Sequence, residues 1–254
     1  LGTVASLKRI TASDIREYVA DRFIPSNMTL SVVGDFEVVH IQTLAERLLR
    51  KYVSGHALPS EAKPNGMSVP INVFDQELIK RNHQANCIIG ATGYSLYDKR
   101  RAALILMINL LGGPSANSRL NALLREKNAL VYGVEASYTQ YRNTGLVTIY
   151  FGTDKNNLEK CRRLVMEQIP NIKSEPLSAY ALKAAKKQLL AQLAISSENG
   201  EVQALAIGNS VMNYGFYHSD KQVREMIENV TAQEIMDVAC DSFADGKISI
   251  LAYK

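Results

Sequence analysis

Cysteine is scarce in this sequence, and long hydrophobic runs are absent. Cys87, Cys161 and Cys240 are odd in number, widely spaced and in no CxxC pair, which argues against a disulfide framework and a thiolate zinc site. We expect them to be core residues. No apolar stretch reaches the ~18 to 20 residues of a membrane helix, and no basic segment followed by an apolar run marks a signal peptide. The sequence therefore predicts a soluble chain without a membrane span.

Histidine is also rare, and the residues that could bind a metal are not grouped. None of His40, His56, His83 and His218 stands at zinc-ligand spacing, and neither HExxH nor HxxEH occurs. Glu37 and His40 have the Glu-x-x-His form of helical di-metal sites. A solvated first helical turn, with Glu37 near the positive end of the helix dipole, is the preferred interpretation. GxSxG, Walker A and GxGxxG motifs are absent, so no self-contained active site is predicted.

The charge balance argues against a nucleic-acid partner. Lys and Arg number 29 against 25 Asp and Glu, a net charge of +4. The basic clusters, at residues 99–101, 162–163 and 186–187, are short and lack interleaved aromatic residues. We therefore expect no nucleic-acid binding. The 46% hydrophobic content is enough to bury a substantial core.

A repeat relates the two ends of the chain at an offset of 220 residues. The first copy contains Thr11, Ala12, Ile15, Asp21 and Phe23, and the second contains Thr231, Ala232, Ile235, Asp241 and Phe243. Because capping boxes of this kind are common, two chance occurrences are the alternative. The spacing favours duplication of a domain of ~200 residues, within the usual size range. Since residue 1 is Leu and not an initiator Met, we expect a fragment: the tail of a first domain and nearly all of a second.

The repeat and the local composition together divide the chain into three predicted segments. Residues 1–53 are predicted to be the tail of the first domain: a helix from Thr11 to Pro25, a strand at 28–33, and a second helix capped by Asp35. Residues 54–70 are rich in Gly, Pro, Ser and Asn and are predicted to be a linker. Residues 71–254 form the second domain.

In the second domain, the hydrophobic pattern predicts strands interspersed with helices. Strands are predicted at 71–74, 85–91, 130–138, 145–151 and 248–253, and the third and fourth of these form a hairpin. Helices are predicted at 97–111, 115–127, 157–168, 177–196, 200–214, 220–228 and 231–243. This order indicates an α+β domain with a largely antiparallel sheet and helices packed on one face.

The segment at 110–153 is the best candidate for function. A glycine pair ends one helix, a Ser/Asn-rich turn starts another, and a hairpin follows. Arg125 lies in the last turn of the second helix, and Tyr132 is two residues into the next strand, so both could project near the same corner. The alternative is that both residues have only structural roles: Arg125 would be stabilised by the helix dipole at a helix C-terminus, and Tyr132 would be an ordinary aromatic residue of the sheet.

The motifs of this segment resemble the second domain of pitrilysin-type zinc peptidases, a family that includes the insulin-degrading enzyme and the mitochondrial processing peptidases. The resemblance rests on LGG, SRL, LREK, a Tyr seven residues after that Arg, TGL and GT, in this order. SLKRIT near the start, NMTLSVVGD and the Tyr214-Gly215 stretch extend it over essentially the whole chain.

The resemblance implies two homologous α+β halves enclosing a chamber, with zinc held by HxxEH and a downstream Glu of the first, catalytic-type half. Residue by residue, Arg125 and Tyr132 match the two substrate-binding residues of the second half. Tyr132 would donate a hydrogen bond to the oxyanion formed when zinc-activated water attacks a peptide carbonyl, and Arg125 would bind a backbone carbonyl.

The sequence departs from the active half of such enzymes. The helix that corresponds to the zinc-binding one reads ALILM at residues 103–107, without imidazole or carboxylate, and Pro114 stands where the family often has Gly. We therefore expect zinc in the parent protein but none bound to this chain, which we predict to be inactive alone.

Three functions follow from the resemblance. The first is the C-terminal, substrate-binding half of a zinc metalloendopeptidase, whose partners are a peptide substrate and the missing zinc domain. The second is a non-catalytic subunit that supplies Arg125 and Tyr132 to a separate zinc-bearing chain. The third is a structural scaffold like the core subunits of a respiratory complex. Substrate preference, compartment and oligomeric state, a dimer included, stay open.

Overall fold

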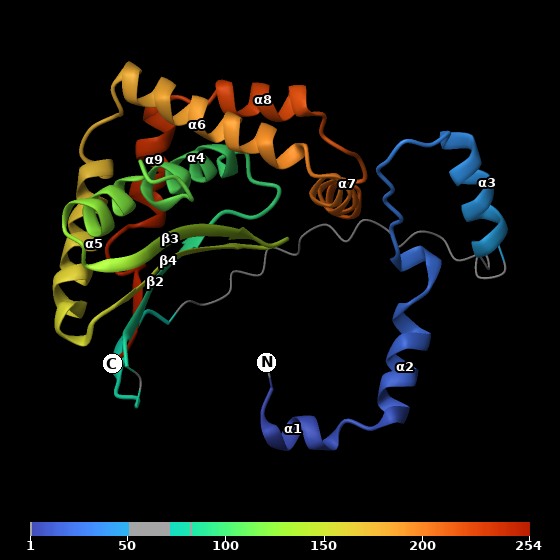
Figure 1. The fold of residues 1–254 in the computed structure, drawn as a ribbon, viewed down its shortest axis with the longest axis horizontal. Helices are drawn as coiled ribbons and strands as arrows, with labels where there is room; N and C mark the ends of the chain where they lie inside the picture. Colours follow the sequence, from blue (N-terminus) through green and yellow to red (C-terminus); the bar gives the residue numbers. More distant parts are fainter. Residues whose placement is uncertain (1, 51–71, 82) are drawn as a thin grey trace. The chain divides into compact units, whose positions relative to one another are not determined.

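The computed structural model describes residues 2–50, 72–81 and 83–254 (Figure 1). The chain divides into two compact units. The described part of one unit consists of residues 2–50 and 196–217. The other consists of residues 72–81, 83–195 and 218–254. The predicted linker at 54–70 lies outside the described residues, as does His56.

The larger unit is built on a five-stranded sheet in the order β1-β5-β2-β4-β3. The strands are β1 (Asp75–Leu78), β2 (Ala85–Gly93), β3 (Val131–Gln140), β4 (Gly145–Thr153) and β5 (Ser249–Tyr253). Only the β1–β5 pairing is parallel among the described strands, and β3 and β4 form the predicted hairpin. The α+β class with a largely antiparallel sheet is confirmed. The strand predicted at 71–74 is wrong for residues 72–74, and residue 71 lies outside the described residues; the ladder with β5 begins one residue later, where Asp75 pairs with Ile250.

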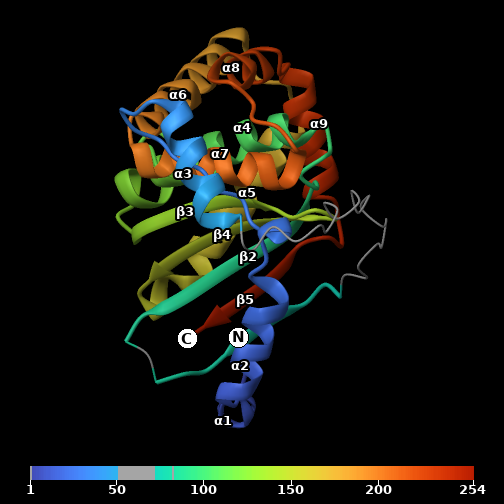
Figure 2. The ribbon, with the colours of Figure 1, turned by 90° about the vertical axis from the view of Figure 1, so that its right-hand side faces the viewer.

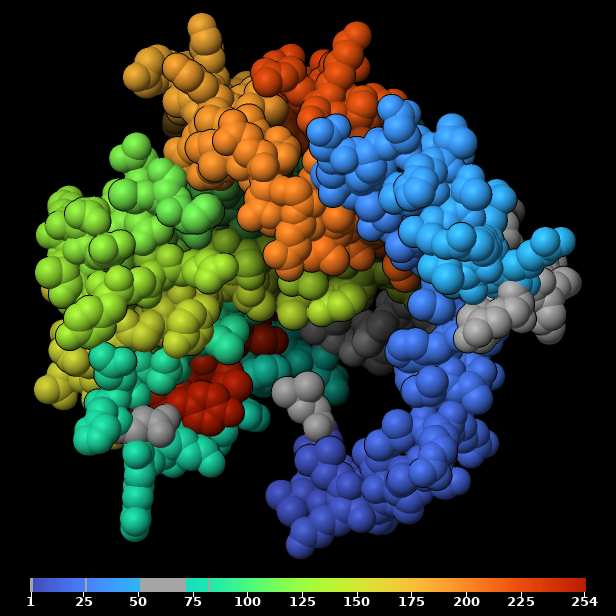
Figure 3. Space-filling view, turned by 45° about the vertical axis from the view of Figure 1, so that its right-hand side comes forward, coloured from blue at the N-terminus to red at the C-terminus, as the bar shows by residue number. Residues whose placement is uncertain are grey.

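Helices cover one face of this sheet (Figures 1 and 2). The helices α4 (Arg101–Gly112), α5 (Leu158–Lys173) and α9 (Ala232–Ser242) contact its strands directly. Outside them lie α6 (Ala179–Ser197) and α8 (Asp220–Glu228). Alternate residues of the central strands, such as Cys87, Ile149 and Phe151, are fully buried beneath the helices. Their neighbours Ile88 and Tyr150 point to the opposite face and are exposed. In the space-filling view, residues of β5 (red) reach the surface among residues of β1 and β2 (teal) (Figure 3).

Two of the three cysteines belong to this core, as predicted. Cys87 and Cys161 are buried, and burial raises the pKa of the Cys87 thiol to about 12, which keeps it protonated at neutral pH. The prediction was wrong for Cys240, which is exposed. It lies on α9 between Ala239, which is buried, and Asp241, which is half-buried. Successive residues on a helix point in different directions, so its Sγ faces outward, 3.7 Å from the Lys173 carbonyl oxygen.

The predicted helix at 115–127 differs most from the structure. Regular helical geometry begins only at Arg119, and residues Asn121–Lys127 form a π-helix, η2. Residues 113–118 are instead a turn, in which the Ser118 amide donates to the Ser115 carbonyl oxygen. This turn follows from the glycine pair and Pro114, which do not support helix.

The smaller unit is helical in the described residues. It contains α1 (Val4–Arg9), α2 (Ala12–Arg22), the short η1 (Pro25–Asn27), α3 (Val38–Leu49) and α7 (Gly200–Tyr214). The predicted strand at 28–33 is extended but not a strand, because the described residues of this unit offer no second strand to pair with it. Glu37, and not Asp35, is the N-cap of α3, and it makes no side-chain capping bond.

The sequence repeat corresponds to a structural repeat. Both α2 and α9 have 11 residues and start with a capping box, Thr11 with Asp14 and Thr231 with Glu234. They differ in burial. In α9, Ile235 is 1% exposed and Phe243, its C-cap, 2%. The matching Ile15 and Phe23 of α2 are 57% and 62% exposed. The apolar face that α9 buries is therefore exposed in α2 within the described residues.

Candidate functional site

A pocket of about 630 Å³ lies where the end of α4, the π-helix and the start of β3 meet. It contains both residues predicted from the sequence, Arg125 from the π-helix and Tyr132 from β3. The other residues that line it are Gln84, Asn86, Gly112, Gly113, Pro114, Asn121, Gly133, Val134, Glu135, Ala136, Tyr150 and Gly152. The fold thus brings the two candidate residues to one place.

Three local irregularities lie between residues 121 and 133. The first is the π-helix itself, which holds Arg125. The second is Ala129, whose φ of 49° is left-handed, a conformation that alanine rarely adopts. Here the Ala129 and Leu130 amides donate to the carbonyl oxygens of Arg125 and Leu124, which ends the helix sharply. The third is a β-bulge in β3. Such irregularities are frequent at functional sites.

The bulge decides where Tyr132 points. Val131 pairs with Thr153 and Gly133 with Gly152, so Tyr132 has no partner residue on β4. The extra residue lets Val131 and Val134, three positions apart, both face the core, while Tyr132 and Gly133 face the open side. Tyr132 is 80% exposed, and its hydroxyl makes no hydrogen bond to the described part of the chain.

The glycine pair at the end of α4 is required for close packing at the pocket's edge. A Cβ on Gly112 would lie 2.7 Å from the Ala136 Cβ, and one on Gly113 would lie 2.6 Å from the Asn109 carbonyl oxygen. Buried Asn121 joins this turn to β3. Its Nδ2 donates to the Ser118 Oγ at 2.8 Å, the Gly113 carbonyl oxygen at 3.3 Å and the Val134 carbonyl oxygen at 3.4 Å. One side chain therefore anchors both walls of the pocket.

Two charged groups line the pocket without neutralising each other. The Arg125 guanidinium is half-exposed, and its nearest ion partner is the Glu126 carboxylate at 3.8 Å. Among the described residues, Glu135 forms no ion pair. Opposite, the Tyr150 hydroxyl donates to the Asn86 Oδ1 at 2.7 Å. The pocket thus offers a cation, an anion and a free phenol.

Sequence reasoning missed Asn121, Glu135, Asn86 and Tyr150. The period-two pattern of the hairpin could have placed Glu135 and Tyr150 on the open face, because a strand alternates its sides. Asn86 comes from a strand 46 residues before Tyr132, so only the sheet order brings it here.

A metal site is not formed by the residues that the structure describes. Within them, no group of three or more His, Cys, Asp or Glu side chains could hold a metal ion. Helix α4, which carries ALILM, is buried and apolar, with Leu104, Leu106 and Met107 fully enclosed. The described residues therefore do not provide a set of ligands for zinc. That the chain binds no zinc stays a prediction.

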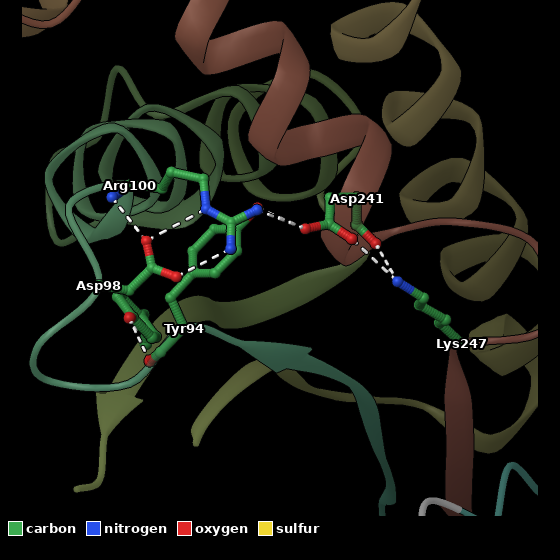
Figure 4. Close-up of polar contacts among 6 residues, drawn as sticks. Tyr94, Asp98, Arg100, Asp241 and Lys247 are labelled. Atoms are coloured by element: carbon green, nitrogen blue, oxygen red, sulfur yellow. Dashed lines mark hydrogen bonds and ion pairs between the residues drawn. The ribbon is translucent and has the colours of Figure 1, made fainter. Parts of the chain in front are cut away.

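A second polar cluster lies away from the pocket and is structural in character (Figure 4). The Tyr94 hydroxyl donates to Asp241 at 2.8 Å, and the Arg100 guanidinium lies 4.0 Å from the Tyr94 ring centre. Burial raises the pKa of Tyr94, so its hydroxyl stays a donor. Lys247 also donates to Asp241, at 2.9 Å. The cluster ties the end of β2 to the start of α4 and the end of α9.

None of the described helices is long and apolar enough to cross a membrane.

Comparisons with known proteins agree with the fold and the family resemblance. The family described as the peptidase M16 inactive domain matches residues 9–189. The chain is 25% identical over 248 residues to the uncharacterized zinc protease YmxG of Bacillus subtilis, covering 96% of this chain and 58% of that protein. It is 23% identical over 266 residues to the mitochondrial-processing peptidase subunit beta of Neurospora crassa, covering 99% of this chain and 55% of that one.

Solved structures show the same architecture. A protease from Helicobacter pylori superposes with a TM-score of 0.83 at 16% identity, over 100% of this chain and 61% of that one. The chain thus spans less than two thirds of the length of these relatives. The resemblance that LGG, LREK and the Tyr seven residues after the Arg predicted is confirmed: this chain belongs to the M16 peptidases, as the inactive domain of that family of zinc-dependent hydrolases.

Proposed function

We propose that this chain is the substrate-binding half of a zinc metalloendopeptidase. The observation that supports this is the convergence of Arg125 and Tyr132, with accessible polar ends, in one pocket. Tyr132 is 80% exposed on its bulge, and the Arg125 side chain is half-exposed on the π-helix. Both geometries are explained if the side chains meet a peptide.

Tyr132 acts as a hydrogen-bond donor in this proposal. When a peptide bond is hydrolysed, negative charge develops on the carbonyl oxygen, and a phenol aimed at that oxygen stabilises the transition state. The bulge projects the hydroxyl away from the sheet, with no internal acceptor among the described residues to compete for it. Arg125 donates from its planar guanidinium to a backbone carbonyl of the bound peptide, which fixes the peptide's position.

Zinc belongs to another part of the parent protein or to a partner chain in this proposal, because the described residues do not provide its ligands. The relatives named as zinc proteases support zinc in the parent. This chain then binds and orients the peptide and supplies the oxyanion donor.

The exposed face of α2 supports the predicted domain division. We propose residues 1–53 as the tail of a catalytic-type domain, 54–70 as linker and 71–254 as the second domain. In α9, the matching residues pack on α4, α5 and β2. An equivalent helix pair and sheet in the first domain would cover Ile15, Tyr18, Val19 and Phe23 of α2.

Tyr132→Phe tests the proposal in the complete peptidase assembly that contains this chain. Loss of one oxyanion donor typically lowers kcat by about 10²-fold or more, so we expect a fall of this size with unchanged melting temperature. Tyr180→Phe is the matched control, since Tyr180 is 84% exposed on α6 and lies outside the pocket. Unaltered peptide hydrolysis by Tyr132→Phe would remove this residue from the mechanism.

A second candidate is a non-catalytic subunit that supplies Arg125 and Tyr132 to a separate zinc-bearing chain. The similarity to a protein named as a subunit of a processing peptidase supports this second candidate. Co-purification of a distinct HxxEH-containing chain supports this candidate. An HxxEH motif in the same polypeptide supports the first. Stable association with a membrane complex, without any peptidase partner, would favour a scaffold and contradict both.

A further inference from the structure

Asn121 is the most deeply buried polar side chain that lines the pocket, with 7% of its surface exposed. One end of its amide is bonded inside the chain. Nδ2 lies 2.8 Å from the Ser118 Oγ, 3.3 Å from the Gly113 carbonyl oxygen and 3.4 Å from the Val134 carbonyl oxygen. Carbonyl oxygens only accept hydrogen bonds, so these contacts assign the nitrogen to this end of the amide and the oxygen to the other.

The Oδ1 of Asn121 receives no hydrogen bond from the described part of the chain. Among the described residues, the polar side-chain atoms that are both fully enclosed and unbonded are the hydroxyls of Ser31 and Ser242. The Asn121 Oδ1 is therefore accessible, and the space that Asn121 lines is the pocket. Because buried amides normally satisfy both ends, an accessible acceptor without a partner points to a donor on a ligand.

A complementary group lies four residues further along the π-helix. Arg125 and Asn121 both belong to the segment Asn121–Lys127, and both line the pocket. One helical segment thus presents a donor, the guanidinium, and an acceptor, the Asn121 Oδ1. In an extended peptide, the N–H and C=O of one residue point to the same side, as in the hydrogen-bonded pairs of an antiparallel sheet. A wall with both kinds of group matches the backbone of an extended peptide.

We propose that the Asn121 Oδ1 accepts a hydrogen bond from a backbone N–H of the bound peptide, next to the carbonyl that Arg125 binds. This inference rests on the proposed function and adds a substrate class to it: peptides with an unsubstituted N–H at this position. Proline and N-alkylated residues lack that hydrogen and are disfavoured there. The bonds of Nδ2 fix the amide in advance, so little side-chain freedom is lost when the peptide binds.

The test changes the substrate first, because Asn121 also holds the turn at 113–118. The complete peptidase assembly is assayed with short fluorogenic peptides in which one amide at a time, never the scissile one, is replaced by an ester. The ester removes the N–H and keeps the length of the backbone. For at least one position, we expect kcat/KM to fall about three- to tenfold, the effect of one lost hydrogen bond.

Variants then separate peptide binding from anchoring of the turn. Asn121→Ala and Asn121→Leu, of which the second is close in shape to asparagine, both remove Oδ1. In either variant that keeps a cooperative melting transition, we expect lower kcat/KM for the all-amide peptide and no further loss with the ester. Ser118→Ala is the matched control. It removes the acceptor 2.8 Å from Nδ2 and leaves Oδ1 in place, so the ester penalty stays.

Three results would overturn this role of Asn121 and leave the proposed function standing. They are no ester penalty at any position in the wild type, a penalty that survives both Asn121 variants, and a penalty that Ser118→Ala abolishes as well. A purely structural Asn121 would give the second result, because its loss would slow cleavage of amide and ester peptides equally. If the wild-type assembly cleaves no peptide, or Tyr132→Phe changes nothing, the proposed function fails and this inference with it.

Discussion

Glycines near the pocket act in two different ways at the scale of single residues. Gly112 and Gly113 are needed because neighbouring atoms occupy the space of a side chain. A Cβ on Gly133 would meet no described atom within 4 Å, and one on Gly152 would make only ordinary contacts, the nearest with the Asn86 Oδ1 at 3.5 Å. The sequence shows the same letter at all four positions. The difference depends on what lies above each Cα, which the packing of α4 against β3 decides.

This contrast makes a stability prediction. In Gly112→Ala the new Cβ would lie 2.7 Å from the Ala136 Cβ and 2.8 Å from the Ala136 backbone nitrogen. Because backbone cannot move as a flexible side chain can, we expect a loss of about 1–3 kcal/mol in the free energy of unfolding. Urea unfolding of the chain measures this. Gly133→Ala is the matched control, since a Cβ there meets no described atom within 4 Å. Equal losses of stability in the two variants would contradict the conclusion that close packing requires Gly112.

At the scale of elements, the site depends on a helix end and a strand start that are both irregular. The π-helix and left-handed Ala129 direct Arg125, and the bulge directs Tyr132. Away from the pocket, the cluster around Asp241 holds β2, α4 and α9 together. Hydrogen bonds from Lys247 and Tyr94 lower the pKa of Asp241, and those from Arg100 lower the pKa of Asp98.

These shifts predict how stability depends on pH. Both carboxyls have lower pKa values in the folded chain than when unfolded, so their contribution is present above the ordinary carboxyl value of about 4. It is lost as the pH falls through the folded values. We expect the melting temperature to decline below about pH 4, less steeply in Asp241→Asn than in the wild type. Asp154→Asn, at an exposed carboxyl, should retain the wild-type slope. An identical slope in Asp241→Asn would disprove this role.

At the scale of the whole molecule, the chain is a part of what its relatives contain. It spans 58% of the Bacillus subtilis zinc protease it resembles, and the described residues hold no cluster of metal ligands. The apolar face of α2 is exposed where its counterpart in α9 is buried. These observations are the basis of the proposal that the parent peptidase holds its zinc outside this chain.

The corresponding prediction concerns zinc and cleavage. After a chelator wash, we expect the purified chain to retain much less than one zinc per molecule and to cleave no peptide. Adding the zinc-bearing half should produce cleavage that a chelator abolishes. Metal analysis and a fluorogenic peptide assay measure both. Stoichiometric zinc, or chelator-sensitive cleavage by the chain alone, would contradict the prediction.

Much of the fold could be predicted from local pattern. Helices α7 and α8 lie where periodicity placed them, and the hairpin strands agree within two residues, because hydrophobic period and capping are local properties. The errors have non-local causes. Residues 28–33 cannot form a strand without a partner, and Cys240 is exposed because of the direction in which α9 packs.

The sequence by itself determined the family and the α+β class, and it pointed to Arg125 and Tyr132 as the candidate site residues, because motifs, spacing and repeats can be read directly from the order of the residues. Only the tertiary structure decided that Arg125 and Tyr132 share one pocket with Glu135, Asn86, Gly133 and Gly152. A bulge, a π-helix and the sheet order β2-β4-β3 bring these groups together. The sheet order depends on pairing between segments far apart in the chain, and the bulge and the π-helix are irregularities that a regular hydrophobic period does not show.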